Sequence, residues 1–145
     1  MATSYRLRVV TPEQVMWDAL ATEIIVRTTE GEIGILAHHL QIISPLVPHI
    51  MTIYDPDGKM DYMAVSGGFI EVTDDGVTML ADAAETPDLV DVARAQRARE
   101  RALERVNSGS GAVAVDVARA RRALLRAENR LKLAGRDIQI QSLTH

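Results

Sequence analysis

The feature that most constrains this chain is a change of hydrophobic period near residue 86. Before that point, short stretches alternate apolar and polar residues, as strands with one buried face do. After it, apolar residues recur every three or four positions, as on one face of a helix. We therefore expect two structural units of the α+β class, residues 1–86 built from strands and residues 87–145 built from helices.

The first unit is expected to hold short strands separated by turn signals. The turn sequences Asp55–Gly58 and Asp74–Gly76 combine Asp, which hydrogen-bonds its own backbone, with Gly, which enters positive φ, so both predict hairpins. The predicted strands are Tyr5–Val10, Gln14–Asp18, Thr22–Thr28, Glu32–Leu36, Ile50–Tyr54, Met60–Val65, Phe69–Thr73 and Val77–Ala81. Many short strands at this spacing predict a β-sandwich or a β-barrel.

A pair of glycines interrupts the strand pattern of the first unit. Gly67 and Gly68 lie between Val65 and Phe69, in a stretch that otherwise alternates as a strand does. Paired glycines at such a place predict a bulge or a close approach of two backbones.

The second unit is expected to be an antiparallel pair of helices. Thr86 offers a capping hydroxyl and Pro87 suits the first helical position, so a helix is predicted from there to Val106. Residues 107–111 (Asn-Ser-Gly-Ser-Gly) break it, and Asp116 is suited to cap a second helix that runs to about Leu133. The predicted contact stripes are Val92, Ala95, Ala98, Ala102 and Val106 on the first helix, and Val117, Ala120, Leu124, Ala127 and Leu131 on the second.

Charge divides the chain at the same place. Residues 1–86 hold 4 basic and 13 acidic residues, a net charge of −9, whereas residues 87–145 hold 12 basic and 7 acidic residues, a net charge of +5. Most of the helical arginines are expected on a solvated helix face. Nucleic acid is the weaker alternative, because the chain is acidic overall and the helical unit has no aromatic residue to stack on bases. An acidic protein surface or another polyanion remains as a partner for the basic unit.

No motif in the sequence predicts catalysis. Glycine-rich phosphate loops, nucleophile elbows and the usual metalloprotease motif are missing, and there is no cysteine. His38 and His39 are adjacent, so on a strand they would point to opposite faces and could not share a metal ion. We therefore expect a non-enzymatic protein without a required cofactor. No apolar run is long enough to cross a bilayer and no signal peptide is recognisable, which predicts a cytoplasmic protein.

Three ordered stretches resemble signature stretches of the epsilon subunits of bacterial F-type ATP synthases, and the resemblance extends over the whole chain. They are Gly31–Leu36, Val65–Val72 and Leu80–Glu85. The resemblance implies a ten-stranded antiparallel β-sandwich of two sheets followed by a helical hairpin. It also implies a non-catalytic subunit of the central stalk, peripheral to the cytoplasmic face of the plasma membrane.

The same resemblance implies partners for each unit. The β-sandwich would bind the gamma subunit and the membrane-embedded ring of c subunits, with Glu32 and His39 at positions that meet the polar loops of the ring. The helical hairpin would extend to the alpha and beta catalytic subunits and block ATP hydrolysis. The alanine-rich stripes suit a hairpin that changes its position, because each buried methyl group contributes only about 0.8 kcal/mol to the packing of the two helices.

Residues 90–95 (Val-Asp-Val-Ala-Arg-Ala) resemble the motif with which some family members bind ATP as a regulatory ligand. The resemblance implies that Glu85 accepts a hydrogen bond from the adenine amine, that Asp91 and Arg94 belong to the site, and that Arg126 and Arg130 face the phosphates. A structural alternative is that Asp91 and Arg94, three residues apart on one helix face, pair with each other. Two other classes of function remain open at this point, a free-standing nucleotide-binding sensor and an accessory β-sandwich interaction module.

Overall fold

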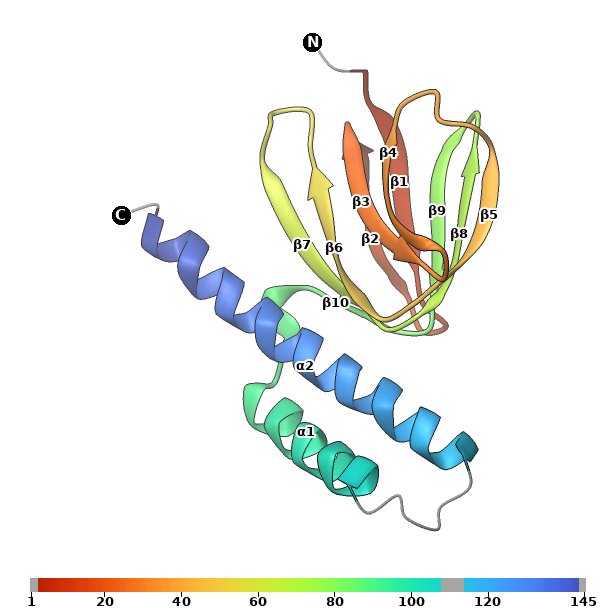
Figure 1. The fold of residues 1–145 in the computed structure, drawn as a ribbon. Coiled ribbons are helices and arrows are strands. Elements are labelled where there is room, and N and C mark those ends of the chain that lie inside the picture. The colour runs from red at the N-terminus through yellow and green to blue at the C-terminus, as the bar shows by residue number, and fades with distance from the viewer. Residues whose placement is uncertain (1–2, 108–113, 144–145) are drawn as a thin grey trace. The chain divides into compact units, whose positions relative to one another are not determined.

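The structure, a computed structural model, describes residues 3–107 and 114–143, with side chains described for 3–107 and 117–135. It divides into two compact units, Met1–Glu85 and Thr86–His145 (Figure 1). The first unit consists of strands and the second of helices, so the predicted fold class is confirmed.

The first unit contains ten strands, most of them five to seven residues long. They are β1 (Tyr5–Val10), β2 (Val15–Ala21), β3 (Glu23–Thr28), β4 (Gly31–Leu36), β5 (Ile42–Leu46), β6 (His49–Tyr54), β7 (Met60–Val65), β8 (Gly68–Thr73), β9 (Gly76–Ala81) and β10 (Ala84–Glu85). All eight predicted strands are present, with ends that differ by up to three residues. The hairpins at Asp55–Gly58 and Asp74–Gly76 are confirmed, since each joins paired strands.

The strands form two five-stranded sheets that pack face to face. One sheet has the order β4-β3-β6-β7-β10 and the other β5-β8-β9-β1-β2, and strand pairing continues from one to the other where Thr28 of β3 pairs with Leu46 of β5. The inward-facing residues of both sheets form one hydrophobic cluster. Its fully buried members include Leu7, Val9, Ile24, Ile35, Met51, Ile53, Met63, Ile70 and Met79.

Two strands and one pairing direction differ from the expectation. No strand is predicted between Leu36 and Ile50, yet β5 lies there and contains Pro45, which lacks the N–H that a sheet ladder needs. In the structure β5 pairs along its length only with β8, so a proline is tolerated there. β10 has two residues, too few to show a period. The sandwich is antiparallel except that β1 and β9, far apart in the chain, pair in parallel.

The glycine pair marks a close approach of two backbones, as predicted. Gly68 has a φ of +120°, and a Cβ atom built on it would lie 2.0 Å from the carbonyl oxygen of Leu80 on β9. Only glycine fits between β8 and β9 at this point.

The second unit begins later as an α-helix than predicted. Thr86 and Pro87 start a short 3-10 helix, η1 (Pro87–Leu89), after which Val90 is extended. The first α-helix, α1, spans Val92–Asn107. The Thr86–Pro87 signal is therefore used by a single tight turn, and the prediction that an α-helix starts there is wrong.

The second α-helix is longer than predicted. It spans Ala114–Leu143 as α2, so the predicted end near Leu133 is wrong. Gly135 lies inside the helix, where a glycine costs about 1 kcal/mol relative to alanine, too little to end a helix that continues with favourable residues.

Asp116 was predicted to cap this second helix, but α2 already begins at Ala114, so the prediction that the helix starts at Asp116 is wrong. Asn107, predicted to belong to the break, is the last residue of α1, and the rest of the break, residues 108–111, lies outside the described residues.

α1 and α2 pack against each other as an antiparallel hairpin, and η1 packs against α2 (Figure 1). The predicted stripes are confirmed at four of their five alanines, because Ala95, Ala102, Ala120 and Ala127 are buried whereas Ala98 is half-buried. We call these four residues the alanine seam. Val92 was predicted to belong to the stripe but is 44% exposed, because it is the first residue of α1.

Candidate functional site

Asp91 caps the first α-helix. Its carboxylate oxygen Oδ1 accepts a hydrogen bond from the backbone N–H of Arg94 at 3.0 Å, and its carbonyl accepts one from Ala95 at 2.9 Å. This is the geometry of an N-cap residue, which satisfies donors that the first turn leaves unpaired. The partner of Asp91 is therefore the Arg94 backbone, which gives this carboxylate a structural role within the predicted ATP motif.

The predicted arginines differ in exposure. Arg94 is exposed, as are Arg97, Arg101, Arg105, Arg119, Arg121 and Arg122, which confirms that most helical arginines lie on a solvated face. Arg126 and Arg130 are instead half-buried. They lie one turn apart on α2, so their side chains share one side of the helix. α2 thus has a partly shielded pair of guanidinium groups, suited to bind phosphate or carboxylate oxygens.

Asn129 is a residue of this region that sequence reasoning missed. It lies between Arg126 and Arg130, on the same side of α2, and is 7% exposed. Its amide nitrogen Nδ2 has no hydrogen-bond partner in the described part of the structure. A buried unpaired amide is costly, which makes it a candidate donor for a ligand oxygen. Burial cannot be read from one polar residue in a helical pattern, although its position between two arginines was visible.

One ion pair indicates how α1 and α2 are aligned. Arg99 Nε lies 3.8 Å from Glu128 Oε1, on the facing helix. In an antiparallel pair this places Arg94 opposite about residue 133, within about one turn of Arg130 along the hairpin. Arg94 and Arg130 therefore belong to the same end of the hairpin. Glu85 is the last residue of β10 and lies in the first unit, so its grouping with these residues stays a prediction.

The two residues predicted to meet the ring of c subunits lie at different ends of β4. Glu32 is near the start of this strand and forms an exposed ion pair with Arg27 on the paired strand β3. Arg27 Nη2 lies 3.5 Å from Glu32 Oε2. His39 follows the turn after the strand, where its N–H donates to the Leu36 carbonyl at 3.3 Å. Four residues of extended strand separate Glu32 from Leu36, about 13 Å. The structure does not bring the two predicted contacts together.

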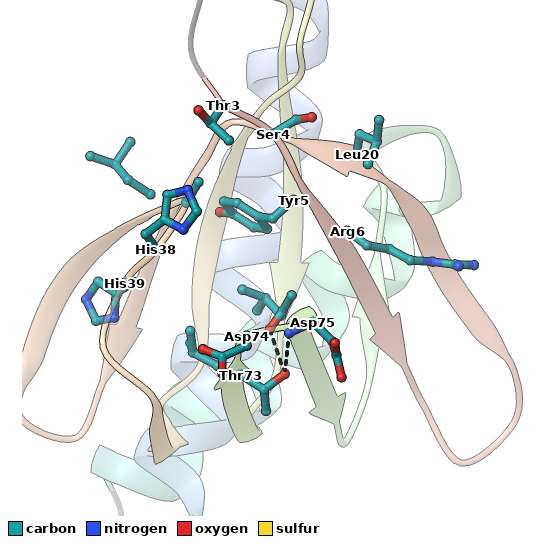
Figure 2. A pocket seen from close by; sticks show the side chains of 15 residues that line it. Thr3, Ser4, Tyr5, Arg6, Leu20, His38, His39, Thr73, Asp74 and Asp75 are labelled. Carbon is teal, nitrogen blue, oxygen red and sulfur yellow. Dashed lines mark hydrogen bonds between the residues drawn. The ribbon is translucent and has the colours of Figure 1, made fainter.

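A pocket of about 480 Å³ lies at the end of the sandwich that holds His38 and His39. Figure 2 shows the two histidines on one side of it and Asp74 and Asp75, from the β8–β9 turn, below Tyr5. The Arg6 side chain points away from the histidines, toward its ion-pair partner Asp18.

Tyr5 has a structural role in this pocket. Its hydroxyl donates a 2.7 Å hydrogen bond to the Ile35 carbonyl of β4 and so ties the two sheets together. Burial, with the negative charge of Glu23, raises the pKa of Tyr5 far above its ordinary value. The hydroxyl therefore stays protonated. His38 and His39 lie in a turn instead of a strand, and His38 has a φ of +64°.

The described residues contain no group of three or more His, Asp or Glu side chains arranged to hold a metal ion. None of the described helices is both long and apolar enough to cross a lipid bilayer.

Comparison with known proteins assigns both units to one family. Residues 4–87 match the model of the ATP synthase delta/epsilon chain beta-sandwich domain, and residues 90–135 match that of the delta/epsilon chain long alpha-helix domain. The ATP synthase epsilon chain of Bacillus subtilis is 45% identical over 131 residues, which are 90% of this chain and 97% of that one. The epsilon chain of Alkalihalophilus pseudofirmus is 44% identical over 106 residues, 73% of this chain and 79% of that one.

Solved structures show the same likeness. A chain in the Euglena gracilis mitochondrial ATP synthase, solved as OSCP, F1 and c-ring, matches with a TM-score of 0.74 and 27% identity, over 90% of this chain and 81% of that one. A chain from the central stalk and c-ring of the Tetrahymena thermophila mitochondrial enzyme matches with a TM-score of 0.60 at 12% identity, which is a likeness of fold. With two family models matched in order and bacterial relatives along most of its length, this chain belongs to the family of ATP synthase epsilon chains.

Proposed function

We propose that this chain is a non-catalytic subunit of the central stalk of a bacterial F-type ATP synthase. Its β unit binds the gamma subunit and the ring of c subunits, and its helical unit limits ATP hydrolysis by contacting the alpha and beta subunits. ATP acts as a regulatory ligand of the helical unit. The complex holds the chain at the cytoplasmic face of the membrane. This proposal rests on one observation: an acidic β unit with a core of large buried side chains is joined to a basic helical unit whose two helices meet mainly through alanines.

The stalk position is supported by the solved structures that the fold matches and by the separate hydrophobic core of the β unit. The Euglena chain that this fold matches comes from an assembly of F1 with the c-ring. The β unit has its own hydrophobic core, so it can serve as a rigid body between two partners. Size-exclusion chromatography of the purified chain with gamma subunit tests this role. A complex is expected, and separate elution of the two proteins contradicts the stalk assignment.

The regulatory role is supported by the small energy that holds the hairpin together. Burial of the four alanines in the seam contributes about 3 kcal/mol, at about 0.8 kcal/mol for each methyl group, and the buried Leu133 adds about 1.5 to 3 kcal/mol. The Arg99–Glu128 pair is partly exposed and adds at most about 1 kcal/mol. A conformational equilibrium separated by a few kcal/mol is readily shifted by a partner or a ligand.

Hydrolysis by the assembled enzyme tests this role. Enzyme rebuilt with a chain that lacks residues 89–145 is expected to hydrolyse ATP faster than enzyme with the full chain, because the inhibitory hairpin is gone. Equal rates from complexes that contain equal amounts of both chains would reject inhibition as the role of the hairpin.

ATP binding is supported by the polar groups at one end of the hairpin. Arg126 and Arg130 are half-buried, and Asn129 between them has a buried amide without a partner. Phosphate or ribose oxygens would satisfy that amide, and a guanidinium group can donate to such oxygens. Arg94 lies at the same end, on α1.

Calorimetric titration with ATP tests the site. The Arg126→Gln and Arg130→Gln double variant is expected to lose ATP binding, while a matched Arg97→Gln and Arg101→Gln variant on the exposed face of α1 keeps it. Equal affinity in the first variant contradicts the assigned site. Retained gamma binding in both variants shows that the β unit is intact.

Two substitutions distinguish the helix-capping role of Asp91 from a direct contact with ATP. Asp91→Ser keeps a good N-cap but removes the charge, whereas Asp91→Ala removes both and should cost about 1 kcal/mol of helix stability. If the carboxylate contacts ATP, both variants lose affinity. If Asp91 acts only as a cap, Asp91→Ser binds ATP as the unchanged chain does.

A further inference from the structure

One continuous stretch of chain leaves one sheet of the β unit and enters the other (Figure 1). β5 ends at Leu46 in one sheet, β6 begins at His49 in the other, and Val47 and Pro48 lie between them. β3 pairs with β5 before this point and with β6 after it, so the chain turns from one sheet into the other beside β3. We call residues 46–49 the sheet corner.

Two backbone hydrogen bonds hold this region against β3. The Val47 N–H donates to the Arg27 carbonyl, and the Thr29 N–H donates to the Pro45 carbonyl, each at 3.2 Å. Pro45 and Pro48 have no N–H, so the sheet corner has fewer backbone donors than a regular strand ladder. The side chain that fills the corner therefore contributes a larger share of what keeps it closed.

That side chain is His49. It is 7% exposed and lies on the same side of β6 as the core residues Met51 and Ile53. Its Nδ1 is 2.6 Å from the Val47 carbonyl oxygen. A carbonyl oxygen can only accept, so Nδ1 carries the proton of the neutral imidazole. Nε2 is then an acceptor, and it is buried without a hydrogen-bond partner in the described part of the chain.

Protonation of His49 puts a charged N–H at this buried Nε2. Burial has the largest influence on the pKa of His49 and lowers it. The hydrogen bond to Val47 and the negative charge of Glu32 raise this pKa, whereas the positive charge of Arg27 lowers it. Arg27 and Glu32 already form an ion pair with each other, so Glu32 is shared with a competing cation.

The elements on the other side of His49 are apolar where they adjoin it. His49 pairs with Val65 of β7, and Val65 pairs with Ala84 of β10. Glu85, the ionisable residue of β10, pairs with Ala64 and therefore faces the opposite side of the sheet. β5 contains no ionisable residue. A protonated His49 thus has no carboxylate to bind on this side, and an unpaired buried charge is costly.

We propose that His49 is an acid-sensitive clasp, which keeps the sheet corner closed while its imidazole is neutral and releases the corner when it is protonated. The imidazolium reaches water by leaving the corner, which breaks its contact with the Val47 carbonyl and frees the two backbone bonds to β3. The rest of the sandwich stays folded. This device lies within the β unit and does not depend on the stalk function.

Release of the corner loosens the neighbouring β3–β4 turn. Thr28 pairs with Leu46 of the corner, and its hydroxyl donates to the Gly31 carbonyl at 3.1 Å within that turn. Glu32 is the next residue after Gly31. Acid therefore acts on the end of the β unit at which Glu32 lies.

The direction of the pH dependence follows from the two states of the corner. In the open corner His49 is in water, where the pKa of a histidine is about 6.5, and in the closed corner its pKa is lower. The closed corner is therefore fully stable above about pH 6.5 and loses stability as the pH falls below that value. With a closed form that stays neutral, the opening equilibrium is about 10-fold larger at pH 5.5 than at pH 7.5.

Amide hydrogen exchange of the full chain, followed by NMR between pH 5.5 and 7.5, tests the inference. The amides of Val47 and Thr29 report on the corner. The amide of Thr22 is the internal reference, because it donates to the Tyr54 carbonyl at 2.8 Å and so reports on the far end of β3 and β6. Added urea separates local opening, which exposes little surface, from global unfolding, which exposes much.

Two variants separate His49 from other ionisable groups. His49→Gln has an amide that can donate to the Val47 carbonyl but takes up no proton in this range. His38→Asn is the matched control, because His38 is exposed and asparagine tolerates its φ of +64°.

We expect the protection of Val47 and Thr29, corrected for intrinsic exchange, to fall about 10-fold between pH 7.5 and 5.5 and to respond little to urea. Thr22 should stay better protected and should respond to urea as global unfolding does. The pH dependence of the corner amides should disappear in His49→Gln and remain in His38→Asn.

Three outcomes would overturn the inference. If Val47 and Thr29 exchange as slowly as Thr22 and with the same response to urea, His49 acts only through global unfolding. If the pH dependence persists in His49→Gln, another group causes it. An NMR titration of the unchanged chain that finds a His49 pKa of 6.5 or higher removes the driving force for release, and this measurement needs no variant.

Discussion

Replacing Gly68 by alanine should severely destabilise the β unit. Gly68 has a φ of +120°, a conformation that costs a residue with a Cβ about 1 to 3 kcal/mol. The added Cβ would also lie 2.0 Å from the Leu80 carbonyl oxygen and 2.9 Å from the Ala81 Cα, both backbone atoms. β8 and β9 must therefore separate where Gly68 pairs with Ala81.

That separation strains the hydrogen bonds that continue the ladder. The Asp82 N–H donates to the Gly67 carbonyl at 3.1 Å, and the Ser66 N–H donates to the Ala83 carbonyl at 3.0 Å. Each bond contributes about 0.5 to 1.5 kcal/mol. Conformational strain and weakened pairing together predict a loss of about 3 to 5 kcal/mol, a large fraction of the stability of an ordinary domain.

Urea unfolding measures this loss, because the single tryptophan, Trp17, lies on β2 and packs against the β core. The midpoint of the Gly68→Ala variant should fall by about 2 M or more. Gly34→Ala is the matched control, since its Cβ would meet only the Glu23 side chain at an ordinary 3.5 Å, and its free energy of unfolding should change by less than about 1 kcal/mol. Equal midpoints for the two variants would refute the steric argument.

Three further predictions concern ionisable groups. His49 is buried, and burial lowers its pKa, so the folded state favours the neutral imidazole. The contribution of His49 to the stability of the β unit should be complete above the unfolded pKa of about 6.5 and should fall as the pH drops below that value. His49→Gln should flatten this pH dependence in urea unfolding monitored by Trp17 fluorescence. The hydrogen bonds from Arg6 hold the pKa of Asp18 below its usual range, and an NMR titration should find it moving back toward that range in Arg6→Gln. Arg99 and Glu128 should show a coupling energy below about 1 kcal/mol in a double-mutant cycle on helix melting, and a larger value would mean that the pair is better shielded than its exposure implies.

The parts of the fold that sequence predicted are those with local causes. The turn at Asp74–Gly76 is dictated by its own residues, since Thr73 accepts from the Asp75 N–H at 3.2 Å and Gly76 has a φ of +134°. β5 was missed because its place depends on β8, a partner far along the chain. The start of α1 was misplaced because two capping signals follow each other, and the first one serves η1 while Asp91 caps the longer helix.

The candidate sites divide in the same way. Arg126 and Arg130 were placed on one side of a helix by their spacing alone, and the structure adds that both are half-buried. The burial of Asn129 between them depends on tertiary packing, so no periodicity could have indicated it. The resemblance assigned Glu32 and His39 to one partner, and the structure adds that an extended strand lies between them, so the shared contact with the ring stays a prediction. Motifs thus identified residues, and only the fold showed which of them lie together.

The uneven packing of the two units has a consequence for how the chain would work. Among the described residues, the large side chains that are fully buried lie in the β unit, with Leu133 as the exception in the helical unit. Each of them contributes about 1.5 to 3 kcal/mol, against about 0.8 kcal/mol for a buried alanine methyl group. The hairpin should therefore open or change partners at a cost that leaves the β core intact. A subunit that stays bound to a stalk while its regulatory part moves needs this difference in stability. Substitutions that add apolar volume to the alanine seam, such as Ala102→Leu, should alter the regulation of ATP hydrolysis without altering the affinity for gamma subunit.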